Sequence, residues 1–147
     1  MINLILNDST KFTREFLDFI NNHRLAYGLV NEVLPNDDSS YIQGEFYDVY
    51  SDDVLVGFLQ LLISEEDEGY YIEINFGIFD EYKGNNYCEE CLKEYFRLDI
   101  AKLYITQAFV YRNNPNKNRI DKILTKLGFE VTCNCIDTIE YTKPLIE

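Results

Sequence analysis

The stretch YYIEINFGIFDEYKGNNYCEECLKEYF, from Tyr70 to Phe96, determines the fold of this chain. Its first part, Tyr70 to Phe79, alternates and is rich in β-forming residues, whereas Tyr87 to Phe96 carries apolar residues at helical spacing. A strand therefore runs through one polar turn directly into an amphipathic helix. The first backbone N–H groups of a helix have no intrahelical partner, and the helix dipole adds partial positive charge there. Such a junction can hold a phosphate without any basic side chain.

The turn itself, Lys83-Gly84-Asn85-Asn86, consists of residues suited to backbone contact with a ligand. Gly84 tolerates backbone angles and close approach that other residues resist, and asparagine visits the left-handed region more readily than most residues. A single glycine after a strand also fits an ordinary strand-to-helix loop, so this turn alone does not define a function.

A second segment, NNPNKNRIDKILTKLGFEV from Asn113 to Val131, follows a further strand and closes its helix on Lys126-Leu127-Gly128-Phe129. This order of elements resembles the GNAT superfamily of acetyl-coenzyme A-dependent N-acetyltransferases over about the C-terminal two thirds of the chain. The family's pyrophosphate loop reads Gln/Arg-x-x-Gly-x-Gly/Ala, and Lys83 to Cys88 is the matching stretch. Lysine replaces the first residue here, Asn86 the middle glycine and Cys88 the final small residue, while Gly84 falls where many members also carry glycine.

The resemblance implies an α/β (α+β) fold, with a mixed, mostly antiparallel sheet of about seven strands flanked by about four helices. The chain of 147 residues, 46% of them hydrophobic, is expected to form a single GNAT-like domain over residues 1–147. Helices are expected over Phe12–His23, with caps among Asn7 to Thr10, and over Leu25–Leu34, Tyr87–Phe96 and Asn116–Leu127. Strands are expected from Met1, within a Glu45–Ile63 hairpin, and over Tyr70–Phe79, Leu103–Val110, Phe129–Cys133 and Ile136–Tyr141.

The formal net charge of −13 argues against partners rich in phosphate, namely nucleic acids and anionic membranes. It favours cationic partners, such as an amine-bearing small molecule or a basic peptide. Acidic clusters such as Asp37-Asp38 and Glu65 to Glu68 also serve simply to keep a protein dissolved. No apolar run is long enough to cross a bilayer, and the start of the chain lacks the basic region of a signal peptide, so we expect a cytoplasmic protein.

Four cysteines occur as Cys88-x-x-Cys91 and Cys133-x-Cys135, and four thiolates would complete a tetrahedral zinc site. The spacing argues against zinc, because the first pair falls in the first turn of a helix and the second in or beside a strand. We therefore expect no metal and free, partly buried thiols. The helix N-terminus would stabilise a thiolate at Cys88, which predicts a somewhat reactive thiol there.

The resemblance also implies the contacts to acetyl-coenzyme A. Backbone N–H groups from Gly84 to Cys88 would hold the pyrophosphate, with Lys83 at the rim, and the strand around Gly77 would pair with the pantetheine arm. Glycine inside a strand indicates close approach of a ligand or a bulge. The residues expected to bind the cofactor are Phe76, Ile78, Phe79, Lys83, Gly84, Asn85, Asn86, Tyr87, Cys88, Asn116 and Asn118.

Some family members use a glutamate on the same strand as base, and Glu73 lies close to that position. Many members carry a tyrosine five residues before the final phenylalanine of the fourth helix, facing the thioester sulfur, but Leu124 stands there in this chain. Tyr104 and Tyr111 are possible substitutes, and Tyr111 is the one we assign. His23 is more consistent with a surface residue than with a base.

Two functions remain open at this level. One is an N-acetyltransferase that moves an acetyl group from acetyl-coenzyme A to a primary amine by direct attack in a ternary complex. The other is a catalytically degenerate binding protein of the same fold, acting on a protein partner through its acidic surface or as an acidic decoy for a nucleic-acid-binding site. Members of this fold often pair through their last strands, so a homodimer is compatible with either.

Overall fold

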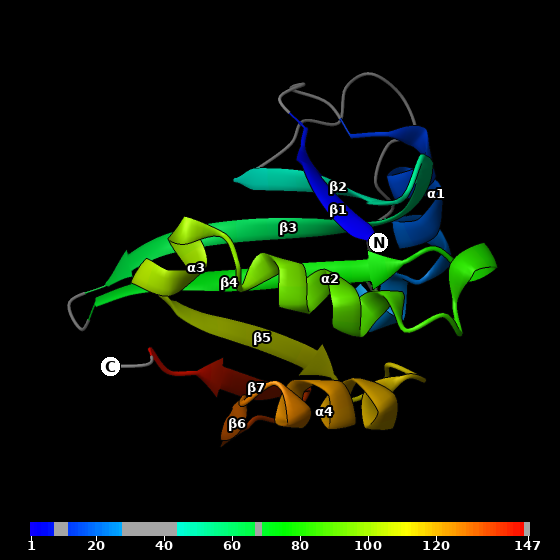
Figure 1. Cartoon of the computed structure of the whole chain (residues 1–147). Helices are drawn as coiled ribbons and strands as arrows, with labels where there is room; N and C mark the ends of the chain where they lie inside the picture. The colour runs from blue at the N-terminus through cyan, green and yellow to red at the C-terminus, as the bar shows by residue number, and fades with distance from the viewer. Residues whose placement is uncertain (8–11, 28–43, 67–68, 146–147) are drawn as a thin grey trace.

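The computed structural model describes residues 1–7, 12–27, 44–66 and 69–145. In this part of the chain, seven strands form one sheet in the order β1-β2-β3-β4-β5-β7-β6 (Figure 1). Only β4 and β5 are parallel, and every other neighbouring pair is antiparallel. The strands are β1 Ile2–Leu6, β2 Glu45–Ser51, β3 Val54–Glu66, β4 Gly69–Ile78, β5 Ile105–Tyr111, β6 Glu130–Asn134 and β7 Thr138–Lys143. The predicted mixed, mostly antiparallel sheet is confirmed.

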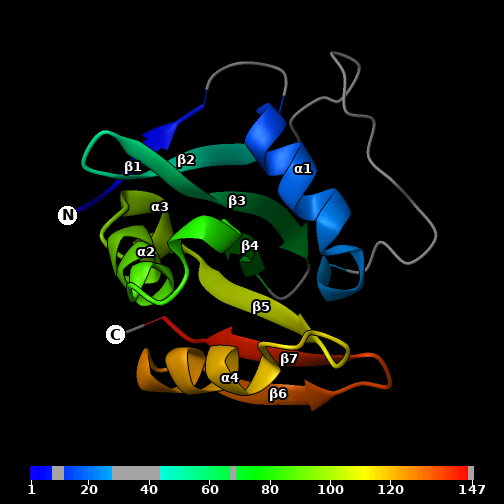
Figure 2. The ribbon, with the colours of Figure 1, turned by 90° about the vertical axis from the view of Figure 1, so that its right-hand side faces the viewer.

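The described residues form four α-helices and two short 3-10 helices, and they cover both faces of the sheet. Figure 2 shows α1 on one face and α2 and α3 on the other. The helices are α1 Arg14–Asn22, η1 Arg24–Tyr27, η2 Asp80–Tyr82, α2 Tyr87–Tyr95, α3 Asp99–Leu103 and α4 Lys117–Lys126. The mixed α/β architecture that we expected is therefore confirmed.

Two apolar clusters hold these layers together, one on each face. The larger packs Ile72 and Ile74 of β4 against α2, α3 and α4, and Leu92, Tyr95 and Leu124 are its fully buried helical members. The smaller packs four residues of α1 against the opposite face of the sheet, largely through phenylalanine rings. Because side chains alternate along a strand, the burial of Ile72 and Ile74 on one face directs Glu73 and Asn75 toward the other.

Local signals at some helix ends differ from our expectations. The N-cap of α1 is Thr13, whose Oγ1 accepts a hydrogen bond from the Phe16 N–H at 3.2 Å, so the cap predicted among Asn7 to Thr10 is wrong. Of the helix expected over Leu25–Leu34, the structure describes only the end of η1, and residues 28–43 lie outside the described part. The short helix α3 was not predicted, because five residues are too few to show helical periodicity.

Candidate functional site

The parallel strands β4 and β5 pair over three rows and then separate. Tyr71, Ile72 and Glu73 face Ile105, Thr106 and Gln107, after which β4 continues to Ile78 and β5 to Tyr111 without pairing to each other. In Figure 1 the two strands diverge toward the end of the sheet where α2 begins. The backbone of β4 therefore offers hydrogen-bonding groups to this gap, and buried backbone groups need a partner.

A cavity occupies the gap between the diverging strands, and we call it the groove. Its walls come from five places: β4 from Phe76 to Ile78, the end of η2 with the turn before α2, the loop after β5, the first turns of α4, and the second half of α1 with η1. Ile120 and Ile123 of α4 make one side apolar. Apolar walls with a few convergent polar groups are typical of a small-molecule site.

The turn before α2 and the first residues of that helix line the groove. Gly84 has φ of +91° and Asn86 has φ of +60°, so both adopt the left-handed conformation that glycine and asparagine accept most easily. Asn86 is the N-cap of α2, and no side chain caps the helix there. The Asn85 side chain donates to the Tyr82 carbonyl at 3.0 Å and stabilises the turn itself. This geometry suits an anion held by a helix N-terminus.

Positive charge at this end of the groove comes from two side chains. Lys83 is paired with Asp80 at 2.9 Å, and Asp80 is also 2.9 Å from the Nε2 atom of His23, so the Lys83 charge is partly compensated. Arg119 of α4 also lines the groove, and no carboxylate pairs with it among the described residues. Sequence reasoning named Asn116 and missed Arg119, although it follows Asn116 by one helical turn.

Tyr27 is a second groove residue that the sequence did not reveal, because it lies in a segment with no recognisable motif. Its hydroxyl donates a hydrogen bond to the Phe76 carbonyl of β4 at 2.8 Å. Its ring contacts those of Phe19 and Phe58, with ring centroids 5.9 and 6.0 Å away. Burial raises the pKa of Tyr27 well above its usual range, so this phenol stays protonated at neutral pH.

Gly77 is explained by packing on the α1 face of the sheet. The register between β3 and β4 continues without a shift at Gly77, so the expected bulge is absent from this described strand pair. A Cβ atom here would lie 2.5 Å from the Tyr27 hydroxyl and 2.7 Å from the Phe58 ring. The close approach that requires glycine is made by aromatic side chains of the protein itself.

The thiol of Cys88 contradicts one expectation from the sequence. Burial raises the pKa of Cys88 to about 12, and the nearby Arg119 offsets this only in part. Desolvation of the thiolate outweighs the favourable position at the helix start, so the predicted reactive thiol is wrong. Cys91, which is fully buried one turn later, has its pKa raised by the same cause.

The structure places the expected cofactor residues in two groups. Those that line the groove are Phe76, Ile78, Lys83, Gly84, Asn86, Tyr87, Cys88 and Asn116. Phe79, Asn85 and Asn118 do not line it: Phe79 is buried against α1, Asn85 braces the turn, and Asn118 is exposed on α4. The groove therefore brings together residues from the turn, β4 and α4.

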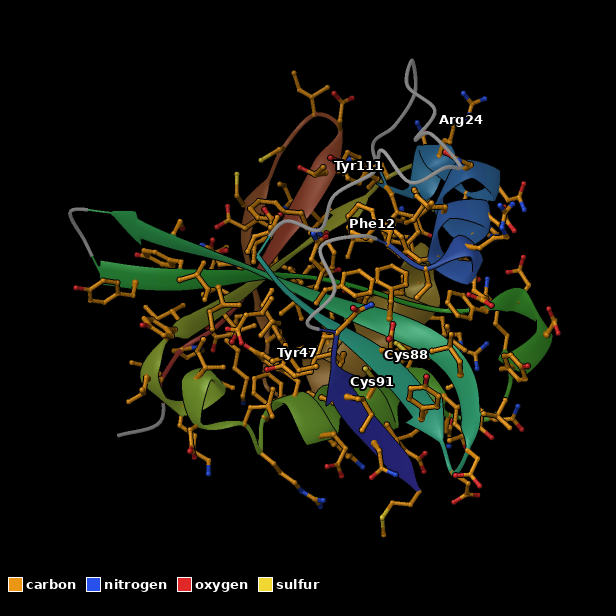
Figure 3. The ribbon with its side chains drawn as sticks, turned by 90° about the horizontal axis from the view of Figure 1, so that it is seen from above. Phe12, Arg24, Tyr47, Cys88, Cys91 and Tyr111 are labelled. Carbon is orange, nitrogen blue, oxygen red and sulfur yellow. The ribbon has the colours of Figure 1, made fainter. Side chains whose placement is uncertain are left out.

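Glu73 and Tyr111, the two residues expected to act in catalysis, lie on the sheet face that α1 also covers. Figure 3 shows Tyr111 on the α1 side and Cys88 and Cys91 on the α2 side. Glu73 stands in the last paired row, opposite Gln107, at the point where the strands begin to diverge. Tyr111 is four residues further along β5, or roughly 13 Å at the usual rise per residue. Neither residue is part of the groove wall.

Glu73 is half-buried and has no cationic partner among the described residues. Burial raises the pKa of Glu73 above its ordinary value of 4.5. The neighbouring Gln107 donates to a carboxylate oxygen of Glu140 on β7 at 3.0 Å. Glu140 stands opposite Phe109, one row beyond Gln107 on the same face, so this face of β4, β5 and β7 carries two carboxylates. A raised pKa suits a carboxylate that accepts a proton from an amine.

Three further observations concern the proton donor, metal ligands and membrane spans. Leu124 is completely buried in the larger cluster, so the helix position usual for the family tyrosine carries no proton donor. No group of three or more metal-ligating side chains lies together within the described residues. No described helix is long and apolar enough to span a membrane.

Solved structures share this architecture over essentially the whole chain. A protein provisionally assigned as a phosphinothricin N-acetyltransferase superposes with a TM-score of 0.75 at 13% identity, covering 100% of both chains. A Bacillus subtilis acetyltransferase in complex with coenzyme A gives 0.66 at 14% identity, covering 98% of this chain and 100% of that one. Campylobacter jejuni N-acetyltransferase PseH with acetyl-coenzyme A gives 0.62 at 16% identity, with 97% of each chain covered.

No protein-family model matches the sequence, and no curated protein matches it either. At these identities the solved structures establish the fold alone. The protein has the fold of the GNAT acetyltransferases, as the sequence resemblance implied.

Proposed function

We propose that this protein is an N-acetyltransferase that transfers an acetyl group from acetyl-coenzyme A to a primary amine by direct attack in a ternary complex. The observation that carries this proposal is the groove between the diverging strands β4 and β5, which ends at the uncapped N-terminus of α2. Two proteins of the same fold were solved with coenzyme A or with acetyl-coenzyme A.

The groove supplies a distinct contact for each part of such a cosubstrate. The N–H groups at the start of α2, with Gly84, Asn86 and Arg119, would hold the diphosphate. The backbone of β4 near Phe76, facing the apolar side chains of α4, would accept the pantetheine arm. Asn116, at the start of α4, would contribute a polar contact at the rim.

The reaction also needs a base for the amine and a donor for the departing thiolate. We assign the base to Glu73, whose raised pKa favours proton uptake directly or through water. The donor assigned from sequence is Tyr111. Tyr27, which lines the groove and bonds to the Phe76 carbonyl, is the competing candidate.

The acceptor is an amine-bearing small molecule or a basic peptide in this proposal. The net charge of −13 attracts cations, and Glu73 and Glu140 share one face of the sheet near the inner end of the groove. A cytoplasmic location, and a homodimer formed through the last strands, belong to the same proposal.

Isothermal titration calorimetry with acetyl-coenzyme A and coenzyme A tests the proposal. Gly84→Glu places a carboxylate at the turn and should abolish binding, because it repels the diphosphate and strains a residue with φ of +91°. Leu103→Glu is the matched control, since it adds the same charge outside the groove. Leu103 lies just before β5, and 68% of its surface is exposed.

Binding that Gly84→Glu abolishes and Leu103→Glu preserves would support the groove as the cosubstrate site. Release of coenzyme A in the presence of amines would then identify the acceptor. Absence of binding to the wild-type protein at saturating ligand would contradict the proposal and favour a binding protein of this fold. Equal loss in both variants would also count against the groove.

A further inference from the structure

The Cys133-x-Cys135 pair lies outside the groove, at the end of the edge strand β6. The two sulfur atoms are 2.9 Å apart, whereas a disulfide requires about 2.05 Å. Both cysteines are half-buried and unbonded in the structure. Burial raises the pKa of the Cys88 and Cys91 thiols, and the neighbouring Cys135 thiol raises the pKa of Cys133. The short distance between the two sulfur atoms, and not thiol acidity, therefore sets the Cys133–Cys135 pair apart.

The backbone holds the two sulfurs together. The pairing of β6 with β7 shifts register between Val131 and Cys133, which reorients the strand just before the pair. The Cys135 N–H donates to the Thr138 carbonyl at 2.9 Å, and the Cys135 carbonyl accepts a hydrogen bond from Arg112 at 3.1 Å. With both of its backbone groups fixed, Cys135 keeps its thiol beside that of Cys133.

We propose that Cys133 and Cys135 form a thiol–disulfide exchange site, which a low-molecular-weight cationic disulfide converts to an intrachain disulfide. The cationic class follows from charge: Cys133 stands opposite Glu140 in the register, and the chain carries a net charge of −13. With one residue between the cysteines, the closed loop removes little chain entropy. The bond is therefore suited to reversible exchange more than to stabilisation.

The reaction balances with cystamine as the oxidant. One cysteine thiolate attacks a cystamine sulfur, the S–S bond breaks, and one cysteamine thiolate leaves. The second cysteine thiolate then attacks the protein sulfur of the mixed disulfide and expels the second cysteamine. The protein loses two electrons and two protons, and cystamine gains them as two molecules of cysteamine.

Mass spectrometry of the reduced full-length protein after treatment with cystamine tests the proposal. Trypsin separates the pair into peptide 127–147 and the other two cysteines into peptide 84–93. In the wild-type protein we expect peptide 127–147 to lose the mass of two hydrogen atoms while the chain remains monomeric. Cys133→Ser and Cys135→Ser should each retain one cysteamine on the remaining thiol, because the resolving thiol is absent.

Three results would overturn the proposal. They are a stable cysteamine adduct on the wild-type peptide 127–147, disulfide-linked dimers on a non-reducing gel, and preferential modification of peptide 84–93. The mass of the wild-type peptide 127–147 tests the proposal by itself, so the test remains valid even if a serine variant fails to fold. Circular dichroism before treatment establishes that each serine variant is folded.

Discussion

At the scale of single residues, the protein places the Glu73 carboxylate where burial opposes its charge. Glu73 is half-buried among β4 neighbours, and no described cation offsets the cost of ionising it. Its pKa is therefore raised above 4.5, the opposite of what an ion-paired carboxylate shows. A residue kept at a cost in stability is typical of a functional site.

We predict that Glu73→Gln increases the free energy of unfolding at neutral pH. The folded protein binds its proton more tightly than the unfolded chain, so ionisation of Glu73 destabilises the fold as pH rises from 4.5 through the folded pKa. The advantage of the variant should be absent well below pH 4.5 and complete above that window. Urea unfolding at several pH values measures it, and a variant less stable than wild type at pH 7 would contradict this account. In the proposed reaction the same variant should lose turnover.

Tyr27 and Tyr111 provide a second comparison between single residues. Tyr27→Phe leaves the partly buried Phe76 carbonyl without its partner and should lower the free energy of unfolding by about 1–3 kcal/mol. Tyr111→Phe is the matched control, because its hydroxyl has no hydrogen bond among the described residues, and it should change stability by less than about 0.5 kcal/mol.

Chemical denaturation of both tyrosine variants gives these stabilities, and coenzyme A release assigns the donor. Loss of turnover only in Tyr111→Phe would support the donor named from sequence. Loss of turnover only in Tyr27→Phe, with coenzyme A binding retained, would assign the proton donor to Tyr27. An equal decrease in the free energy of unfolding in both variants would show that the Tyr27 hydrogen bond makes no net contribution to stability.

At the scale of elements, the contact between η1 and β4 controls the shape of the groove. The Tyr27 side chain reaches β4 only because Gly77 has no Cβ, and the rings of Phe19 and Phe58 close around the same point. Four elements, α1, η1, β3 and β4, therefore meet at one glycine. A small change at Gly77 should displace η1 relative to the strand.

We predict that Gly77→Ala destabilises the protein by about 1–3 kcal/mol, because the new methyl group would overlap three aromatic side chains. Gly84→Ala is the control, since open space surrounds that position and only its φ of +91° opposes a side chain. The control should cost about 1 kcal/mol. Thermal unfolding measures the stability of both variants. A destabilisation by Gly77→Ala no larger than that by Gly84→Ala would show that the aromatic side chains around Gly77 move aside at little energetic cost.

At the scale of the whole molecule, the net charge of −13 opposes compaction through repulsion among the carboxylates. We predict that raising NaCl from about 0.01 to about 0.15 M increases the Tm at pH 7, because the screening length falls from about 30 to about 8 Å. The increase should vanish near the isoelectric point of about 4.4, where the net charge is zero. Differential scanning calorimetry at both pH values decides, and the same salt effect at both would exclude charge repulsion as its cause.

The sequence by itself determined the features that depend on neighbours along the chain. The strand, polar turn and helix from Tyr70 to Phe96 were predicted because periodicity changes from two to 3.6 residues at a glycine turn. Gly128 ends α4 with φ of +96°, as expected of glycine after a helix. The order of these local elements resembles that of the GNAT superfamily, and this resemblance predicts the fold.

Only the tertiary structure decided which distant residues meet. Tyr27 bonds to a carbonyl 49 residues away, and Arg119 enters a groove whose opposite wall comes from β4. Burial, and not the helix start, sets the Cys88 pKa. These outcomes depend on long-range packing and desolvation, which residue spacing does not encode, because they arise only when separate elements exclude water from the same space.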